Sequence, residues 1–434
     1  MSSPRLNTAS LATLAKGTKV PGYDRAKVTP GIVHLGIGAF HRAHMAVYVD
    51  DLLGQDPSWG IVGASLRRPD TKEALEPQDG LYTIAVRDAE GTHPRVIGSI
   101  LSVMDANTQR EELLNLMADP AIRIVSLTVT EKGYCHDPAT GELDQKHADI
   151  VHDLDNPTAP KSAPGMLVEA LARRKAAGAA PFTVMSCDNL PSNGETAKRI
   201  VTAFAALRDA ELGEWIKSVA FPSTMVDRIV PSTTDADRAE VAGLIGVEDA
   251  WPIMTEPFTQ WVIEDRFASG RPAWERAGAL LVADVTPFEK MKLRMLNGTH
   301  SLMAWLGFMA GHEYIRDAIA DPVISRQRHG DRGARQNRAV HNPGALHRRT
   351  ETHNCHLRRV DHGIKRVGPA LAHAGDGDGA LRNLGVAQPT VAGTRHHITD
   401  RRHHGIEFQA VRIADRGGDQ PATAHRHGQT GMDS

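Results

Sequence analysis

The chain has 434 residues, with 50 basic (Lys and Arg) and 52 acidic side chains and a formal net charge of −2. This length favours two domains, or one large domain with an appendage, and the near-neutral charge argues against nucleic-acid binding. No stretch approaches the roughly 20 apolar residues of a membrane span, and the first residues lack the apolar core of a secretory signal. We therefore expect a cytoplasmic protein that associates with neither a membrane nor a nucleic acid. The cysteines are too few and too scattered for a disulfide framework or a tetrahedral zinc site, so we expect no metal: Cys135, Cys187 and Cys355.

The net charge averages two unlike regions. Residues 1–324 contain 32 basic and 42 acidic side chains, whereas residues 325–434 contain 18 basic and 10 acidic ones. The second region also holds 13 of the 22 histidines but only one aromatic residue, Phe408. Its apolar residues recur with neither helical nor strand periodicity, so we expect disorder or loosely formed structure there. The function is therefore sought in residues 1–324.

Short apolar runs recur in that first region, with helical stretches between them. Nearly continuous β-rich runs are typical of strands buried on both faces of a parallel sheet, and they occupy residues 32–38, 61–66, 122–129 and 182–187. Residues 41–53 have apolar side chains at helical spacing, which completes a strand–helix–strand unit. Further helices are expected over 165–177 and 194–208, and a long helical stretch begins at Asp284. The pattern predicts an α/β fold with a mostly parallel sheet, followed by a helical region.

A glycine turn follows the first predicted strand. Gly36 and Gly38 would permit a tight turn, and the N–H groups of the helix that follows could hold a pyrophosphate. The third glycine of the usual dinucleotide fingerprint is missing; instead Phe40 lies in the turn, and Arg42 is placed to contact a phosphate. Strand-to-helix turns often need glycine for their own geometry, so the motif alone is a weak indication of a dinucleotide.

The residues after the second predicted strand bear on the choice of cofactor. Asp70 is the candidate partner for the ribose 2′-hydroxyl of NAD. Arg67 and Arg68 beside it could instead hold the 2′-phosphate of NADP. We favour NAD and leave NADP open.

A lysine lies on a helix rich in methionine and leucine. A step of about 100° per residue brings four polar side chains within one arc of about 140°: Glu289, Lys292, Asn297 and His300. Apolar surroundings disfavour the charged form of a lysine, so the pKa of Lys292 should fall toward the range of a general base. Asn297 could donate to a developing alkoxide. The competing interpretation is an ordinary polar face of a partly exposed helix.

Two further polar clusters come at predicted strand ends, the edge at which open α/β sheets bind ligands. Residues 186–191 contain Asp188 and Asn189, although such residues at a strand end are often plain turn residues. Residues 128–134 contain Lys132, which competes with Lys292 for the role of general base. The chemistry of the residues does not separate the two lysines.

Six segments in this order resemble the polyol-specific long-chain dehydrogenases, a family that includes mannitol 2-dehydrogenases and fructuronate reductases. The resemblance covers residues 5–322 or so, and the segments are VHLGIGAFHRAH (33–44), SLTVTEKGYC (126–135), TVMSCDNLPSNG (183–194), FPSTMVDRIVP (221–231), EPFTQWVIEDRF (256–267) and FEKMKLRMLNGTHS (288–301). It implies a Rossmann-type domain over 1–283, the start of a helical substrate domain over 284–322, and a metal-independent, NAD-linked interconversion of an alcohol and a ketone. The implied substrate is a polyol or a sugar acid, with D-mannitol favoured over D-mannonate, and we expect a monomer.

The resemblance also implies roles for single residues. Lys292 would be the general base, Asn189 and Asn297 would hold the oxyanion, and His300 would orient a substrate hydroxyl. Asp227 would contact the polyol chain, and Glu289 would lie on a proton path beside the lysine. Lys132 becomes a cofactor-side residue in this interpretation, and the expected cofactor contacts are Gly36, Gly38, Phe40, Arg42, Asp70, Thr130, Glu131 and Lys132.

The resemblance ends near Val323, inside what should be a folded domain. Residues 323–434 are rich in Arg, His, Gly and Ala, which is typical of a GC-rich gene read out of frame, so our hypothesis is a frameshifted tail. Two alternatives are a basic arm for nucleic acid and a metal-binding histidine tract around His396 and His403. Loss of the helical domain would expose apolar residues of 301–320, and an inactive dinucleotide-binding relic then competes with an active dehydrogenase.

Overall fold

The computed structural model describes residues 4–324, which belong to two units, 4–301 and 302–324. The α-helices are α1 (Ala39–Ala43), α2 (Met45–Asp50), α3 (Asp70–Leu75), α4 (Arg110–Ala118), α5 (Ala148–Asp155), α6 (Ala163–Ala176), α7 (Asn193–Arg208), α8 (Ala210–Ile216), α9 (Asp235–Ile245), α10 (Thr286–Met291), α11 (Gly298–Met309) and α12 (Ile315–Ala320). The strands are β1 (Pro30–Leu35), β2 (Gly60–Ser65), β3 (Tyr82–Arg87), β4 (Thr92–Ile97), β5 (Ile100–Asp105), β6 (Ile124–Leu127), β7 (Thr183–Ser186), β8 (Thr224–Asp227), β9 (Ile253–Thr255), β10 (Gln260–Glu264) and β11 (Leu280–Val282). Two short turns matter below: the 3-10 turn η5 (Glu131–Tyr134) and the π-helical turn η7 (Lys292–Asn297).

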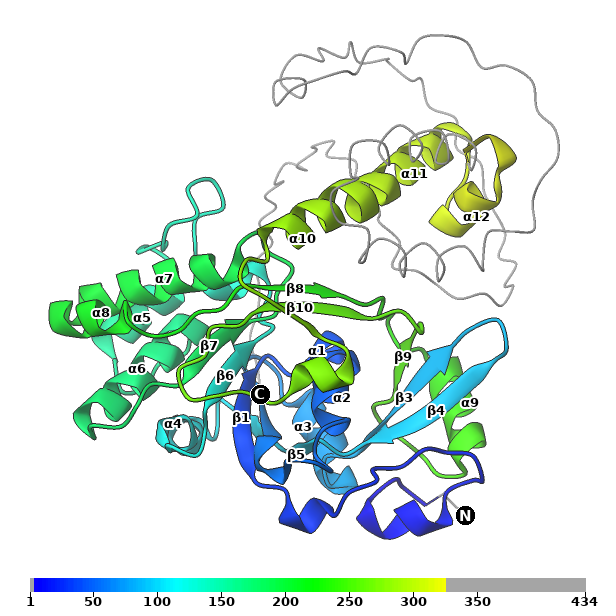
Figure 1. Cartoon of the computed structure of the whole chain (residues 1–434), viewed down its shortest axis with the longest axis horizontal. Helices are drawn as coiled ribbons and strands as arrows, with labels where there is room; N and C mark the ends of the chain where they lie inside the picture. Colours follow the sequence, from blue (N-terminus) through cyan, green and yellow to red (C-terminus); the bar gives the residue numbers. More distant parts are fainter. Residues whose placement is uncertain (1–3, 325–434) are drawn as a thin grey trace, which may run out of the picture. The chain divides into compact units, whose positions relative to one another are not determined.

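The four apolar runs predicted as strands all belong to one five-stranded sheet. Its order is β5-β2-β1-β6-β7, and every neighbouring pair is parallel (Figure 1). Every residue of β2, β6 and β7 is buried, which is why their sequences are nearly continuous in apolar residues. The predicted α/β fold on a mostly parallel sheet is therefore confirmed.

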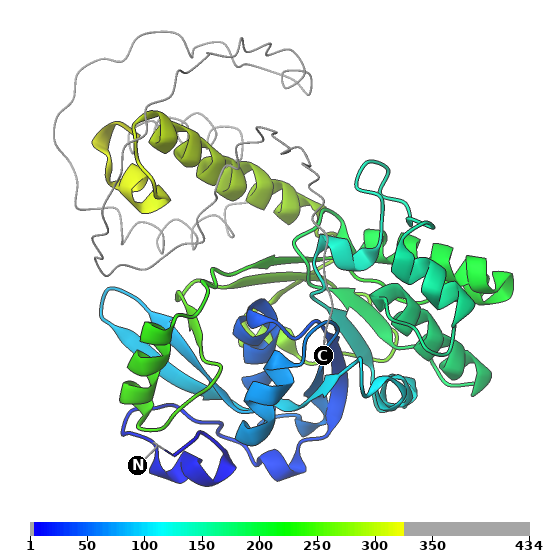
Figure 2. The same ribbon diagram turned by 180° about the vertical axis from the view of Figure 1, so that it is seen from behind.

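The two faces of this sheet pack against different helices (Figures 1 and 2). Val33 and Leu35 of β1 belong to an apolar cluster that includes buried residues of α4, α6 and α7. Ile32, which points to the opposite face, belongs to a second cluster with residues of α2 and of β3 and β10. Alternate residues of one strand thus serve two cores, as expected for a sheet covered on both sides.

Two smaller sheets accompany the main one. Strand β10 pairs antiparallel with β8 and parallel with β11, and β3 lies between β4 and β9. These strands were not predicted from the sequence. Strand β8 matters for the site because it ends at Asp227.

The prediction of one continuous helix over 41–53 is wrong. The chain forms α1 and α2 instead, separated at His44, whose backbone angles of φ −117° and ψ −94° lie outside the helical region. The imidazole of His44 is fully buried and its Nε2 lies 3.0 Å from the carbonyl oxygen of Gln260. A helical backbone at this position would carry the ring away from that partner, so tertiary contacts override the helical pattern.

The second unit, residues 302–324, has a small core of its own. Met303, Ala318 and Ile324 are buried together, and Gly307 allows close packing because an added Cβ would lie 2.7 Å from the Cβ of Ala318. The apolar exposure predicted for this segment is found at Trp305, Phe308 and Met309, whereas Leu302 and Leu306 are half-buried.

The expectations for the tail, including the frameshift, the basic arm and the histidine tract, concern residues 325–434 and lie outside the described residues. Within residues 4–324, none of the helices combines the length and the apolar character needed to cross a bilayer.

Candidate active site

The turn between β1 and α1 needs glycine at one position and is open at the other. Gly36 has φ +88°, and an added Cβ would lie 2.2 Å from the carbonyl oxygen of Thr128 on the neighbouring loop. Gly38, the N-cap of α1, is exposed, and the nearest atom to an added Cβ is 3.9 Å away. The backbone at Gly38 is therefore accessible to a ligand, and Gly36 is required by the packing of the protein itself.

The polar residues that follow this turn point into the protein. Arg42 is only 3% exposed, and its guanidinium donates to the carbonyl oxygen of Trp251 at 2.6 Å. Burial lowers the pKa of Arg42 to about 10, and its guanidinium lies over the ring of Tyr82. This side chain thus ties α1 to the segment before β9, and the phosphate contact expected for Arg42 stays a prediction.

Three histidines of the same segment are buried as well. The ring of His34 lies 2.8 Å from the hydroxyls of both Ser126 and Thr128, and it stacks on His41 at a centroid distance of 3.4 Å. Burial lowers the pKa of His34 and of His44 to about 3, so both rings are neutral at physiological pH. These buried histidines pack beneath the turn and stabilise the fold there.

Phe40 and Asp70, the other predicted cofactor contacts near this turn, are both half-buried. The ring of Phe40 stacks on His44 at 5.1 Å. Asp70 begins α3, and its carboxylate pairs with the guanidinium of Arg68 at 2.6 Å. Asp70 is the candidate for the ribose of NAD, and Arg68 is a candidate for the 2′-phosphate of NADP. Because these two side chains bind each other, their arrangement favours neither cofactor over the other.

The loop after β6 is held by a buried aspartate from the loop after β7. Asp188 accepts hydrogen bonds from the N–H groups of Val129 at 3.1 Å and Thr130 at 2.9 Å, and from the hydroxyl of Tyr134 at 2.8 Å. Burial raises the pKa of Asp188, and the three donors partly offset that effect. Thr130 has φ +65°, a backbone conformation that a β-branched residue rarely adopts. Sequence reasoning treated Asp188 as a plain turn residue and missed this function.

Lys292 is brought to the same edge of the sheet by the π-helical turn. Its Nζ donates to Oδ1 of Asn189 at 3.1 Å and to the carbonyl oxygen of Val226 at 2.6 Å, and it lies 4.0 Å from a carboxylate oxygen of Asp227. Asn189 is exposed, whereas Asp227 is buried. Three residues predicted for the site, 38 or more positions apart in the chain, are thus brought together: Asn189, Asp227 and Lys292.

The surroundings of the lysine amine differ from the prediction. Nζ is surrounded by oxygen atoms, and the apolar neighbours Leu293 and Met295 face solvent. The amine reaches beyond its own helix, so its hydrogen-bond partners come from the loop after β7 and from β8. The lowered pKa expected for Lys292 stays a prediction.

The other polar residues of this helix occupy different places. Glu289 accepts a hydrogen bond from the N–H of Ser192 at 3.1 Å, and burial raises its pKa. Asn297 closes the π-helical turn and His300 lies in α11, and both are half-buried. Each residue in a π-helical turn advances by less than the 100° of an α-helix, so the predicted arc does not apply from Lys292 to Asn297.

Glu131 and Lys132 are both exposed on η5, whereas Lys292 is the lysine whose Nζ contacts Asn189. A second residue missed in the sequence, Asn193, holds the neighbouring strand ends together. Its side-chain amide donates to the carbonyl oxygens of Asp188 and Thr224, both at 2.9 Å, and accepts from the N–H of Thr224.

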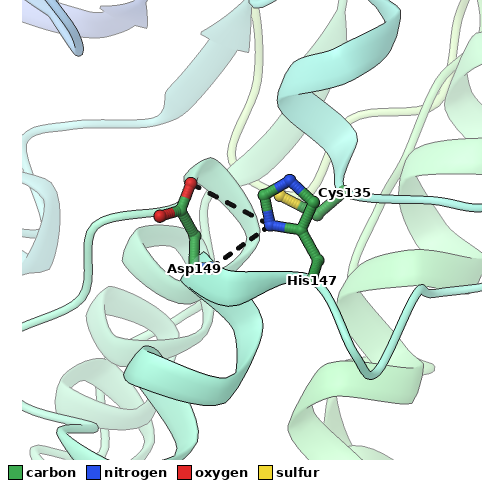
Figure 3. A group of neighbouring side chains, drawn as sticks. All are labelled: Cys135, His147 and Asp149. Atoms are coloured by element: carbon green, nitrogen blue, oxygen red, sulfur yellow. Dashed lines mark hydrogen bonds and ion pairs between the residues drawn. The ribbon is translucent and has the colours of Figure 1, made fainter. Parts of the chain in front are cut away.

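One group in the described residues has the ligand types of a metal site. The ligand atoms of Cys135, His147 and Asp149 lie within 4.8 Å of one another (Figure 3). Their spacing matches no common zinc motif, so the sequence does not reveal the group. However, Nδ1 of His147 accepts the N–H of Asp149 and caps α5, and burial raises the pKa of the Cys135 thiol to about 12. The arrangement thus has a structural explanation as a helix cap.

Two family models and several known proteins match this chain. Residues 30–276 match the family model of the mannitol dehydrogenase Rossmann domain, and residues 284–342 match that of the mannitol dehydrogenase C-terminal domain. The chain is 51% identical over 312 residues to the D-mannonate oxidoreductase of Escherichia coli, a match that covers 70% of the chain. It is 46% identical over 341 residues to a mannitol 2-dehydrogenase of Aspergillus terreus, with 75% of the chain covered.

A solved structure is also similar. The ternary complex of Pseudomonas fluorescens mannitol 2-dehydrogenase with NAD and D-mannitol matches with a TM-score of 0.75 and 42% identity, over 81% of this chain and 73% of that one. The chain spans just under two thirds of the Escherichia coli relative, 64% of its length, and 68% of the Aspergillus relative.

Proposed function

The chain belongs to the mannitol dehydrogenase family, and from this premise we propose that it is an NAD-dependent oxidoreductase that interconverts a polyol and its 2-keto sugar. D-mannitol and D-fructose are the favoured pair. The similar structure that holds NAD and D-mannitol supports both the cofactor and the substrate class. The observation that carries the proposal is the lysine amine held between Asn189 and Val226, beside Asp227, at the carboxyl edge of the parallel sheet.

The residues of the β1–α1 turn fit a dinucleotide. Gly38 is exposed and leaves open space where a side chain would stand, so a pyrophosphate could approach the backbone N–H groups there. Gly38, Phe40 and the exposed loop Thr130–Lys132 would hold the cofactor, with Asp70 at the ribose. Bound NAD⁺ supplies the hydride acceptor.

The proton is assigned to Lys292. A neutral lysine amine has two N–H donors, which match the two oxygens of Asn189 and Val226, and a lone pair that can take the proton of the substrate hydroxyl. When Oδ1 of Asn189 accepts from Lys292, its amide N–H groups remain to stabilise the negative oxygen that forms. Asp227 would bind a neighbouring hydroxyl of the polyol. Asn297 and His300 would complete the substrate contacts, and Glu289 would exchange protons with solvent.

A second candidate is a fructuronate reductase acting on D-mannonate and D-fructuronate. The 51% identity to a D-mannonate oxidoreductase favours it, because this value is higher than that to the mannitol 2-dehydrogenase. The two candidates share the hydride and proton steps and differ only in whether the substrate ends in a hydroxymethyl group or a carboxylate.

The test is a substrate panel on the full chain with NAD⁺, containing D-mannitol, other hexitols and D-mannonate, with NADH formation as the readout. We expect the highest kcat/KM with D-mannitol and no loss of turnover on addition of a metal chelator. A higher kcat/KM with D-mannonate would select the second candidate. NADH binding without turnover on any substrate would indicate the inactive relic, and the same panel on a chain with the frame restored after residue 322 would then show whether the tail is the cause.

A further inference from the structure

The ends of three strands at the site are tied together by hydrogen bonds that centre on Asp188. Asp188 is only 8% exposed, and its carboxylate accepts hydrogen bonds from the N–H groups of Val129 and Thr130 after β6. Its carbonyl oxygen accepts from the amide of Asn193, which also holds Thr224 at the start of β8. Asp188, in the loop after β7, therefore holds the segment after β6 directly and is linked to the start of β8 through Asn193.

This arrangement holds a conformation that the loop would not adopt alone. Thr130 has φ +65°, and such a backbone is unfavourable for a β-branched residue. The N–H of Thr130 donates to one carboxylate oxygen of Asp188, and the N–H of Val129 and the hydroxyl of Tyr134 donate to the other. Charge-assisted bonds of this kind are stronger than neutral ones, so they can offset both the backbone strain and the burial of the carboxylate.

The next residue along the chain reaches the reacting groups. Asn189 follows Asp188 directly and accepts from Nζ of Lys292 at 3.1 Å. Residues 188 and 189 thus fix the positions of two parts of the site. One is the loop 130–132, which the proposed function assigns to the cofactor, and the other is the Asn189 amide that contacts the lysine. A change at Asp188 would move both together.

We propose that Asp188 is a positioning residue that fixes the cofactor-side loop Thr130–Lys132 relative to Asn189 and Lys292. This inference rests on the proposed function. Asp188 itself touches neither Lys292 nor a reacting atom; it acts through Thr130 and through the backbone of Asn189.

The chain offers a matched control for this proposal. Asp153 is a fully buried aspartate that likewise accepts two backbone N–H groups, those of Lys161 and Ser162, and one hydroxyl, that of Ser162. Its Oδ1 also lies 2.9 Å from Nδ1 of His152. The partners of Asp153 lie in α5 and directly before α6, and the proposed function assigns none of them to the cofactor or to the substrate. Asp188→Asn and Asp153→Asn therefore make the same chemical change at two buried carboxylates that both accept two backbone N–H groups and a hydroxyl.

In Asp188→Asn an NH₂ group replaces one carboxylate oxygen and faces an N–H or O–H donor, so at least one of these hydrogen bonds is lost. The loop should then leave its strained conformation. We expect the Kd for NADH, measured by titration of the full chain well below its unfolding temperature, to rise about tenfold, and kcat to fall by a similar factor. Asp153→Asn should lower the unfolding temperature at least as much and leave both values within about twofold of the wild type. Equal NADH affinity in wild type and Asp188→Asn, or an equal loss in the two variants, would overturn the proposal.

A milder variant keeps the proposal testable if Asp188→Asn does not fold. Tyr134→Phe removes one donor to Asp188, and Tyr23→Phe removes the similar bond to Asp50 elsewhere in the chain. We expect weaker NADH binding, by about threefold, only for Tyr134→Phe, and unchanged binding would contradict the inference. Because NADH affinity is measured without a substrate, the result stands even if the substrate panel gives no turnover, which separates this proposal from the proposed function.

Discussion

The β1–α1 turn and the lysine site lie at the same carboxyl edge of one sheet, but they use their polar residues differently. In the turn, His34, His41 and Arg42 are buried and their rings and guanidinium pack inside the protein. At the lysine site, Asn189 is exposed and Lys292 reaches it from another element. Both regions are polar in sequence, yet one supports the fold and the other is accessible to a substrate.

This difference shows why a conspicuous motif does not by itself identify ligand contacts. The segment GIGAFHRAH offers several residues of suitable chemistry, but burial leaves mainly the exposed backbone at Gly38 for a ligand. The lysine site is assembled from three distant segments, and each of them contributes one residue. If the two regions divide stability and catalysis between them in this way, substitutions in the turn and at the lysine should change different measured properties.

The largest expected effect is at the lysine. Lys292→Ala removes the proposed general base, and kcat for the preferred polyol should fall by roughly 10³-fold, within the range for loss of acid–base catalysis. The Kd for NADH should stay within about twofold, since the proposed function assigns Lys292 to the substrate hydroxyl and not to the cofactor. Lys290→Ala, an exposed lysine on α10, is the control and should retain full activity. Activity in Lys292→Ala but not in Lys132→Ala would reverse the assignment of the base.

The two glycines of the turn should separate stability from binding. Gly36→Ala places a Cβ against the carbonyl oxygen of Thr128 at a positive φ, so we expect a loss of roughly 2–4 kcal/mol in the free energy of unfolding. Gly38→Ala meets no such contact and should unfold within about 1 kcal/mol of the wild type while binding NADH several-fold more weakly. Denaturant titration and NADH titration measure the two effects, and a Gly38→Ala variant with unchanged affinity would remove this turn from the cofactor site.

Arg42 should behave as a structural residue. Arg42→Met leaves the carbonyl oxygen of Trp251 without its donor, so the free energy of unfolding should fall by about 2 kcal/mol. NADH affinity, measured where the variant is fully folded, should not change. A large loss of affinity at unchanged stability would restore the phosphate contact that the sequence predicts.

The smallest effect is expected at Glu289 and depends on pH. Burial raises the pKa of its carboxyl in the folded state, so the folded state holds the proton more tightly than the unfolded one. Its contribution to stability is present below the ordinary carboxyl pKa and is lost as the pH rises through the raised value. Glu289→Gln should remove that decline from the pH profile of the unfolding free energy, whereas Glu73→Gln, at an exposed position, should leave it in place.

The sequence by itself determined the class of fold and most of the main sheet. The apolar runs that became β1, β2, β6 and β7 are buried on both faces, so hydrophobicity alone identified them. The edge strand β5 was missed because Ser102 is exposed and breaks the apolar run. The resemblance of the motifs identified the family, and it named Lys292, Asn189 and Asp227 before their proximity was known.

Only the tertiary structure decided what each polar residue does. Asp188 reads as a turn residue because its partners, Val129, Thr130 and Tyr134, lie 54–59 positions away, beyond any local pattern. Arg42 reads as a phosphate ligand because sequence carries the charge of a side chain but not its burial. The break at His44 and the π-helical turn at Lys292 have the same origin: contacts with distant strands outweigh the local preference for a regular helix.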